Sequence, residues 1–447
     1  MASARKWKSG LSGFFVVWTG QFVSTVGTLM TSMALTFWAF DVTGRATELG
    51  LMFFFTFGPR LIFMPIAGAL LDRWNRKKLL IIADALAGLT SIATLALVHL
   101  DALEIWHLYV LTALLSTFGC FQNPGFTASA TLMVPKKHYG RTSGLLMLTY
   151  SASSIIAPAL AGILLPILGL KGILLVDLAT FLVAVGAIAL IPIPQPERDP
   201  AAPIHPVRQI GRDLVEGFRY LFEHGKLFTL LSIHAGINML GIFYDVLLRP
   251  MVLLRTGDNE IALATILSLF GFGGAAGALA VTLWGGPKKR RIPFSFLVYI
   301  LAFALRAISG LKIGVFWLAA FAFGFSACLS LGTSAVRAFF QSKVPPALQA
   351  RVWATFITMV TAGMQVTMLI AGPLADRVFE PAMQSGGALA RLFGGLVGTS
   401  AGSGLGLLIF LGNLGAVIVF AIGYAFRSMR SLDVSLPDHD QTAEETP

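Results

Sequence analysis

Charged residues are scarce in this 447-residue chain. Asp, Glu, Lys and Arg make up only 12% of it, whereas an ordinary soluble domain carries about 25%. So little charge cannot cover a water-exposed surface, which excludes a soluble enzyme and a disordered chain. Cysteine is also scarce, because only Cys120 and Cys328 are present, both inside apolar runs. They are interpreted as small core residues, and a disulfide scaffold is excluded.

Motifs of common catalytic chemistry are missing as well. The chain has no HExxH zinc motif and no phosphate-binding loop that ends in Gly-Lys-Ser/Thr. Without an ATP-binding loop the chain cannot hydrolyse ATP alone, so any work that it performs would have to be driven by an ion gradient or by the gradient of a substrate. We therefore predict no enzymatic activity, no bound cofactor and no metal site.

Long apolar runs dominate what is present. Apolar residues make up 56% of the chain, and the mean hydropathy is +0.77. A helix needs about 20 apolar residues to cross the hydrocarbon, and these runs are too long and too uniform for barrel strands. The first run follows MASARKWKSG without a small-residue cleavage site, so we expect a retained span. The twelve predicted spans cover 12–40, 47–71, 78–99, 105–131, 142–165, 170–192, 227–253, 260–284, 293–310, 313–340, 350–378 and 404–427.

Basic residues set the predicted orientation. Lys plus Arg number 33 and Asp plus Glu number 22, which gives a net charge of +11. Most of the basic residues fall at the N-terminus and in every second loop, as at 73–78 and 288–291. Loops that are rich in Lys and Arg lie in the cytoplasm. We therefore expect a multi-pass protein of the cell (inner) membrane with both termini in the cytoplasm, and no nucleic-acid partner.

One polar stretch divides the chain. Residues 193–226 carry both signs of charge, and Ile210, Leu214, Phe218 and Leu221 have helical spacing within it. This pattern predicts an amphipathic helix on the cytoplasmic surface. The predicted parts are a six-helix bundle over 1–192, the linker over 193–226, a second six-helix bundle over 227–431 and a disordered cytoplasmic tail over 432–447.

The two halves share a short pattern. Val-Pro at 134–135 is followed after five residues by Arg141, and Val-Pro at 344–345 is followed after five residues by Arg351. Six spans plus six, with a long linker between them, indicate a duplicated architecture. Transporters of this kind bind their substrates between the repeats, near mid-membrane.

The segment GALLDRWNRKK at 68–78 resembles the signature that follows span 2 in the major facilitator superfamily. In that signature a Gly and three further residues precede Asp-Arg, and a Gly-Arg pair precedes two basic residues. Asn75 replaces the second Gly, and Asn also tolerates a left-handed turn. The resemblance implies the twelve-helix fold in two pseudo-symmetric bundles and a gating loop that stabilises one conformation through charge contacts. The alternative is that the basic residues only set topology. The matching residues are Gly68, Asp72, Arg73, Arg76, Lys77 and Lys78.

Other segments are similar to the macrolide-efflux and enterobactin-exporter branch of drug antiporters. They are Val-Thr-Gly at 42–44, Leu-Arg-Pro at 248–250, Gly-Pro-Leu-Ala-Asp at 372–376 and the Gly-rich loop at 386–404. The role of that loop is left open.

Two spans depart from the antiporter patterns. Drug antiporters carry Gly-Pro and Gly-Gly in span 5, where this chain has Ala157, Pro158 and Gly162. These small residues are interpreted as helix packing, with an antiporter motif as the alternative. Many proton-driven exporters carry an Arg in span 4, and Leu115 stands at that position.

Polar residues form one stripe in each of spans 1, 4, 7 and 10, which line the central cavity in the superfamily. Ser and Thr also bond their own helix backbone, so a stripe alone does not decide between a cavity and a packed face. Ionisable residues within a span are candidate functional groups, and Asp245 and Arg249 are spaced to pair with each other. The predicted cavity residues are Gln21, Thr25, Thr28, Ser32, Thr112, Ser116, Asn123, Asn238, Ser326, Ser330 and Thr333. The predicted coupling residues are His234, Asp245 and Arg249. Asp84 and Asp177 are interpreted as packing or near-interface residues.

These features favour a secondary active transporter that exports amphipathic small molecules by alternating access. Drugs, macrolide-like molecules and siderophore-like molecules are the expected substrates, with H+ as the expected coupling ion and the protein as a monomer in the lipid bilayer. An uptake symporter or a lipid transporter of the same fold is the alternative. A non-transporting scaffold or receptor is a further alternative, against which the aligned polar stripes argue.

Overall fold

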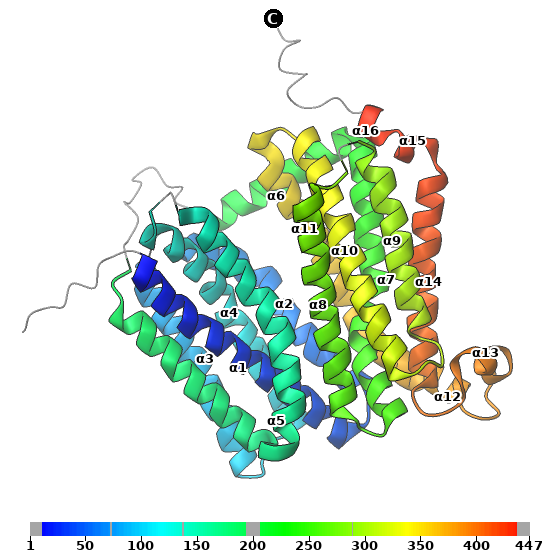
Figure 1. Cartoon of the computed structure of the whole chain (residues 1–447), viewed down its shortest axis with the longest axis horizontal. Helices are drawn as coiled ribbons and strands as arrows, with labels where there is room; N and C mark the ends of the chain where they lie inside the picture. The colour runs from blue at the N-terminus through cyan, green and yellow to red at the C-terminus, as the bar shows by residue number, and fades with distance from the viewer. Residues whose placement is uncertain (1–10, 72–73, 136–137, 194–205, 288, 436–447) are drawn as a thin grey trace, which may run out of the picture. The chain divides into compact units, whose positions relative to one another are not determined.

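The computed structural model describes residues 11–71, 74–135, 138–193, 206–287 and 289–435, and these residues are almost entirely helical (Figure 1). Apolar runs without competing turn signals form helices because only a helix satisfies every backbone group within one segment. In chain order the elements are α1 (Leu11–Thr43), α2 (Ala46–Leu71), α3 (Arg76–His99), α4 (Ile105–Met133), α5 (Tyr139–Leu190), α6 (Pro206–Glu223), α7 (Gly225–Thr256), α8 (Glu260–Trp284), α9 (Arg291–Ile308), α10 (Val315–Lys343), α11 (Pro346–Leu374), the π-helical turn η2 (Ala375–Phe379), α12 (Glu380–Met383), α13 (Ala390–Val397), α14 (Ser403–Ala425), α15 (Arg427–Arg430) and α16 (Leu432–Ser435).

Eleven helices among the described residues are long and apolar enough to cross a membrane, so the predicted all-α membrane fold is confirmed. The predicted span 142–165 and all but the last two residues of the span 170–192 fall within α5, which has 52 residues. At about 1.5 Å per residue α5 would measure about 78 Å, more than twice the hydrocarbon thickness of about 30 Å. Gly169 inside α5 has φ 64° and ψ 180°, which no helix can hold, so the chain bends there between two helical segments.

The described chain divides into two compact units. The first comprises residues 1–42 and 54–207, and the second comprises residues 43–53 and 208–447. The second unit thus includes the beginning of α2 and all but the first two residues of the helix α6, which lies within the predicted linker. The four-part division with boundaries at 192, 226 and 431 stays a prediction, and residues 436–447 of the predicted tail lie outside the described residues.

The first unit is held together by small residues at helix contacts. α3 packs against α4 and α5, and a buried apolar cluster that includes Phe14, Leu80 and Ile188 joins α1, α3 and α5. A side chain built on Gly20 of α1 would meet Ala187 of α5 at 3.0 Å. Within a bilayer, such close backbone approach replaces the hydrophobic effect as the source of helix association.

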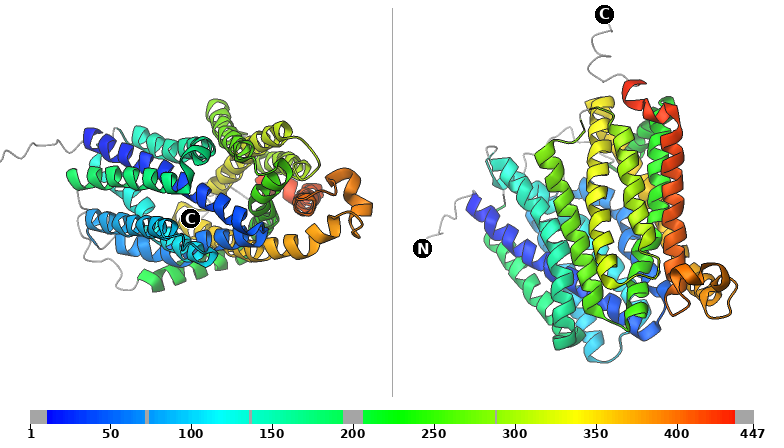
Figure 2. Two further views of the ribbon diagram at one scale, coloured as in Figure 1. Left: turned by 90° about the horizontal axis from the view of Figure 1, so that it is seen from below. Right: turned by 45° about the vertical axis from the view of Figure 1, so that its right-hand side comes forward.

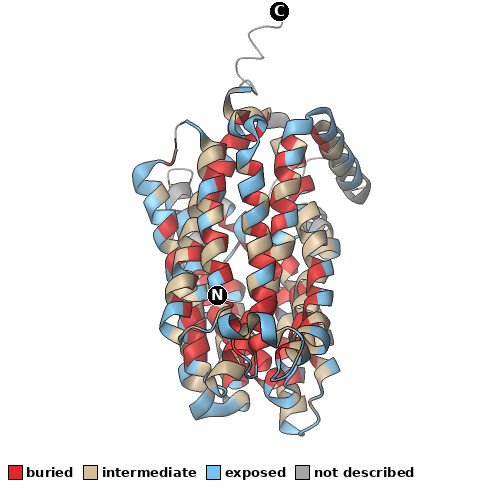
Figure 3. Ribbon diagram, turned by 90° about the vertical axis from the view of Figure 1, so that its right-hand side faces the viewer, coloured by how far each residue is buried: buried red, intermediate tan, exposed pale blue. Residues whose placement is uncertain are grey.

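The second unit has a core that is rich in aromatic rings. α10 packs against α8 and α9, and α14 packs against α9 and α7 (Figure 1). Phe296, Phe339 and Phe420 are each at most 1% exposed within the main cluster. Buried and exposed stretches alternate along the helices that face the viewer in Figure 3. Some outward side chains are apolar, such as Leu283, which is 80% exposed, and they suit a lipid-facing surface.

The segment that follows α11 leaves the bundle sideways. The π-helical turn η2 leads into α12 and then α13, and this segment projects beside the end of α14 in both views of Figure 2. Glu380 attaches it to the bundle, since the two carboxylate oxygens accept hydrogen bonds from Gly402 N at 2.7 Å and Gly404 N at 2.8 Å. These are free backbone donors at the start of α14. The Gly-rich loop at 386–404 therefore contains the short helix α13 and ends in a capped helix terminus.

Candidate functional site

The loop that resembles the superfamily signature connects α2 to α3. Lys77 at the start of α3 donates from Nζ to the Ala189 and Ile191 carbonyls at 2.9 Å each, which attaches α3 to the end of α5. Asn75 has φ −63° and accepts a hydrogen bond from Lys78 N at 3.0 Å. The expectation of a left-handed turn at Asn75 is therefore wrong, because this Asn acts as the N-cap of α3.

The other residues of that loop are placed as follows. Gly68 lies in the last turn of α2, and Arg76 is the first residue of α3. Asp72 and Arg73 lie outside the described residues, so the charge contacts expected of them stay a prediction.

The polar stripe of α1 contacts two buried carboxylates. Asp84 of α3 accepts hydrogen bonds from Gln21 at 3.3 Å and from Gln122 of α4 at 2.6 Å. Asp177 accepts from Thr28 at 3.2 Å and from Ser91 at 3.3 Å. Each carboxylate is 3% exposed, so both hold helices of the first unit together, in line with the packing interpretation.

The remaining residues of the α1 stripe do not contact these carboxylates. Thr25 donates to the carbonyl of Gln21, four residues earlier, and Ser32 is exposed. Thr25 therefore follows the local alternative in which a hydroxyl bonds its own helix.

Arg60 of α2 contacts α4 at Ser116, the residue that follows Leu115. Ser116 of α4 is buried and donates to the Thr56 carbonyl of α2, and Arg60 of α2 donates from Nε to Ser116 Oγ at 3.4 Å. The Arg60 guanidinium carbon also lies 5.1 Å from the centre of the Phe57 ring. α2 thus brings a basic group to Ser116 of α4, the residue next to Leu115. Of the other two α4 stripe residues, Thr112 is half-buried and Asn123 is exposed.

An ion pair lies inside the second unit. Asp245 of α7 pairs with Arg306 of α9, and the Arg306 guanidinium carbon lies over the rings of Tyr244 at 4.1 Å and Phe325 at 4.3 Å. The Arg306 side chain is 5% exposed and the Asp245 side chain is 40% exposed. The Asp245 carboxylate therefore contacts a buried cation and is itself partly exposed.

Asp245 forms its salt bridge with Arg306 rather than with Arg249, although Arg249 still interacts electrostatically with Asp245. The Arg249 guanidinium carbon instead lies 4.8 Å from the centre of the Phe53 ring, at the beginning of α2. The spacing of four residues along α7 permits a pair, but a buried Arg from another helix offers two flanking aromatic faces and a drier environment, where charges attract more strongly. Helix spacing alone gives no sign of a partner on α9.

His234 occupies a different environment from Asp245 although both lie on the same stripe of α7. It is buried, its Nδ1 bonds the Leu230 carbonyl at 2.8 Å, and its ring lies edge-on to Phe296, Tyr299 and Phe420. Asn238, one turn further, is exposed and donates to the His234 carbonyl. The predicted coupling role of His234 is untested, and its surroundings are those of a core residue.

The α10 stripe contacts α8 and α9. Ser330 donates to the Gly274 carbonyl of α8 at 3.1 Å, and the Thr333 hydroxyl lies 3.3 Å from the Tyr299 hydroxyl of α9. Ser326 is buried beside Gly274, on which a side chain would meet Ser326 Oγ at 3.0 Å. In the first unit, the span 5 residues Ala157, Pro158 and Gly162 are all buried. Within the described residues, no cluster of three or more His, Cys, Asp or Glu side chains forms a metal site.

A carboxylate caps the beginning of α2 within the second unit. Asp376 in η2 accepts hydrogen bonds from Ala46 N at 3.1 Å, Thr47 N at 2.8 Å and Thr47 Oγ1 at 2.5 Å. Gly372 makes this approach possible, because a side chain there would overlap the Thr47 backbone. A carboxylate at a helix N-terminus satisfies free donors and complements the helix dipole.

We expect Asp376→Asn to lower the free energy of unfolding by about 1 kcal/mol, because Asn retains one acceptor oxygen and loses the charge. Thermal unfolding of the purified protein in detergent measures the change. Asp258→Asn is the matched control, since Asp258 is exposed and its φ of 60° suits Asn. Equal unfolding temperatures for the two variants would show that the cap contributes nothing.

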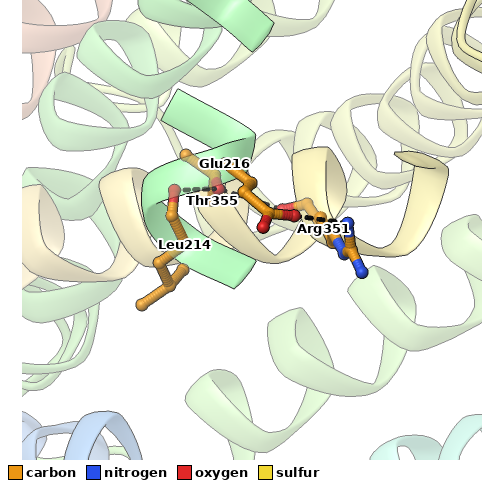
Figure 4. A network of polar contacts seen from close by, with 4 residues as sticks. All are labelled: Leu214, Glu216, Arg351 and Thr355. Carbon is orange, nitrogen blue, oxygen red and sulfur yellow. Dashed lines mark hydrogen bonds and ion pairs between the residues drawn. The ribbon is translucent and has the colours of Figure 1, made fainter. Parts of the chain in front are cut away.

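The helix α6 is attached to α11 by the network drawn in Figure 4. Arg351 of α11 pairs with Glu216, and Thr355 donates to the Leu214 carbonyl at 3.4 Å. Gly217 allows the contact, because a side chain there would lie 2.8 Å from the Arg351 carbonyl oxygen and would overlap Thr355. Arg141, which shares the Val-Pro-Arg pattern with Arg351, is instead exposed.

Gly217→Leu is expected to detach α6 from α11, because the added side chain has no room; overpacking of this kind costs about 1–3 kcal/mol. Limited proteolysis of the purified protein should cut within 206–223 faster than in the parent chain. Gly211→Leu is the control within the same helix, since nothing lies within 4 Å of a side chain there. If both variants are cut at the same rate, the contact between α6 and α11 does not hold the helix.

Apolar helices in two units, with buried charges and hydrogen-bonded carboxylates inside them, define a polytopic helical membrane protein with polar groups at membrane depth. The family model described as the Major Facilitator Superfamily matches residues 17–366, and the chain therefore belongs to this superfamily of transporters. The protein is thus a multi-pass integral membrane transporter.

The relatives include efflux proteins at low sequence identity. Macrolide efflux protein A of Streptococcus pyogenes is 26% identical over 372 residues, which cover 82% of this chain and 90% of the relative. The multidrug efflux pump Tap of Mycobacterium bovis is 24% identical, and the match covers 74% of this chain and 80% of the pump. The enterobactin exporter EntS of Shigella flexneri is 24% identical over 51% of this chain and 54% of its own length. The predicted resemblance to the macrolide-efflux and enterobactin-exporter branch is confirmed.

Solved structures share the fold. The nucleoside transporter NupG has a TM-score of 0.66 at 13% identity, and the match covers 93% of this chain and 100% of that structure. A bacterial homologue of the iron transporter ferroportin in an inward-facing state has a TM-score of 0.64 at 14% identity, with 93% and 99% covered. At such identities these likenesses concern the fold alone.

Proposed function

We propose that the protein is a secondary active exporter of amphipathic small molecules, such as drugs, macrolide-like or siderophore-like compounds, and that it exchanges them for protons. The observation that carries this proposal is the pair of Asp245 and Arg306. A carboxylate at membrane depth binds and releases a proton, whereas the guanidinium of an Arg stays charged. The open side of Asp245 gives access, and the buried Arg306 fixes its position.

Proton binding and substrate binding can compete at such a carboxylate. When Asp245 is ionised, its negative charge attracts a cationic group of a substrate. When it is protonated, that charge is lost and the carboxyl group carries a hydrogen-bond donor. The rings of Tyr244 and Phe325 are buried and lie over the Arg306 guanidinium, so they keep this cation away from water and hold it against Asp245. If Asp245 faces each side of the membrane in turn, it exchanges a proton for a substrate molecule. The flux of protons is then coupled to the flux of substrate.

Intracellular accumulation of test compounds in an efflux-deficient bacterial strain that expresses the chain tests the direction of transport. Erythromycin, ethidium and enterobactin represent a macrolide, a cationic dye and a siderophore. We expect lower intracellular accumulation of at least one of them, and the return of accumulation to the level of the empty strain when a proton uncoupler is added. Raised, uncoupler-sensitive accumulation would instead assign the protein to uptake.

A further inference from the structure

An apolar groove runs along the second unit between α7 and α14. Two adjoining cavities of about 460 Å³ and 670 Å³ share the lining residues Thr229, Ile233 and Val419, so they form one continuous groove. Its walls include Ile422 and Phe426, which are 51% and 60% exposed. These are large apolar side chains with one face uncovered on membrane-spanning helices.

One end of the groove is cationic. Lys226, at the start of α7, lines it together with Ser428, and Arg427 and Arg430 follow directly after α14. Lys226 is exposed and forms no ion pair within the described part of the chain. Glu223, the acidic residue closest to it in sequence, is already paired with Arg219 at 3.0 Å. The charge at this end is therefore positive and open to an anion.

The length of the groove matches one leaflet of a bilayer. From Lys226 to Leu240, which lines its far end, α7 rises about 21 Å at 1.5 Å per residue. One leaflet contributes about 15 Å of hydrocarbon, half of the total of about 30 Å. The groove thus has room for an acyl chain along its apolar part and a headgroup at its cationic end. The glycine at 236 keeps it open, because nothing lies within 4 Å of a side chain built there.

We propose that this groove binds an anionic phospholipid, with one acyl chain along Ile233, Val419 and Ile422 and the phosphate against Lys226. The bound phospholipid would come from the leaflet on the side of Lys226. The distribution of basic residues predicts that this side is cytoplasmic. Charge complementarity distinguishes this lipid from the zwitterionic lipids that surround any membrane protein, since a Lys near an anionic headgroup is worth about 1 kcal/mol.

Native mass spectrometry of the purified full chain tests the proposal with phosphatidylglycerol and phosphatidylcholine, supplied in equal amounts in mixed micelles. The parent chain should retain phosphatidylglycerol preferentially. Lys226→Gln should lower that preference about fivefold, which corresponds to about 1 kcal/mol, while Lys289→Gln, at another exposed Lys, should leave it unchanged. Gly236→Leu should reduce retention of both lipids, because the side chain fills the groove. Gly186→Leu, at another helical glycine with open space around it, should not.

The outcomes separate this site from ordinary solvation by lipid. An equal preference in Lys226→Gln and Lys289→Gln would overturn the headgroup assignment, and unchanged retention in Gly236→Leu would overturn the groove. Displacement of phosphatidylglycerol by ethidium in the parent chain would assign the groove to substrate and would also overturn the proposal. Lys226 is exposed and Gly236 has open space, so neither variant removes a packed side chain; unfolding temperatures equal to those of the controls verify this.

Discussion

Asp245→Asn is expected to abolish proton-driven efflux, because Asn keeps the size of the side chain and cannot take up or release a proton. It is also expected to lower the free energy of unfolding by about 3 kcal/mol, since it leaves the Arg306 charge buried without its partner. We place the effect at the low end of the range because Asp245 is 40% exposed. Efflux from energised vesicles and thermal unfolding measure the two effects separately.

A second variant separates the lost chemistry from the lost stability. In Asp245→Asn combined with Arg306→Gln, the Arg306 charge is removed together with its partner, so part of the lost stability should return. The return is incomplete because Arg249 also interacts with the Asp245 charge. Efflux should stay absent because the titratable carboxylate is still missing. Recovery of efflux together with stability would show that the pair serves only the fold. Asp258→Asn, at an exposed aspartate, controls for the loss of one negative charge.

The second large effect is expected at the contact between α8 and α10. A side chain on Gly277 would lie 2.9 Å from Ala327 Cα, and one on Gly273 would lie 2.8 Å from the Phe323 backbone. Gly277→Leu should therefore separate the two helices and cost about 1–3 kcal/mol or more. The yield of monodisperse protein after extraction and its unfolding temperature should both fall.

Gly186→Leu is the matched control for that variant. Both changes replace a helical glycine by the same residue, and so both gain about 1 kcal/mol of helix propensity. Nothing lies within 4 Å of a side chain on Gly186, so the control should be as stable as the parent chain or more so. Equal stability of the two variants would refute the close packing of α8 on α10.

The fold could be predicted because its signals are local. Apolar runs of about 20 residues identify spans wherever they occur, and nearly every predicted span coincides with one described helix. The two spans predicted at 142–165 and 170–192 correspond to the two segments of α5 on either side of the bend at Gly169. The signature at 68–78 identified the superfamily, because its residue types and spacing are rare by chance.

The partners of the candidate residues could not be predicted. Arg306 falls within the predicted span 293–310, but only the packing of α9 against α7 brings it to Asp245. In the same way Gln122 reaches Asp84 and Arg60 reaches Ser116 from helices that the sequence does not order in space. Stripes along one helix indicate which face a residue occupies; they carry no information about which side chain stands opposite. His234 shows this, because it shares its stripe with Asp245 and lies among aromatic rings.

Exchange of protons for substrate at Asp245 is the central claim, and one measurement tests it most directly. The purified chain is reconstituted into vesicles that contain a pH-sensitive dye, and the internal pH is followed when ethidium, erythromycin or enterobactin is added outside. We predict a substrate-dependent proton flux in the direction opposite to that of substrate with the parent chain, and none with Asp245→Asn. No change of internal pH when a transported substrate is added to the parent chain, or the same change with Asp245→Asn, would contradict the account.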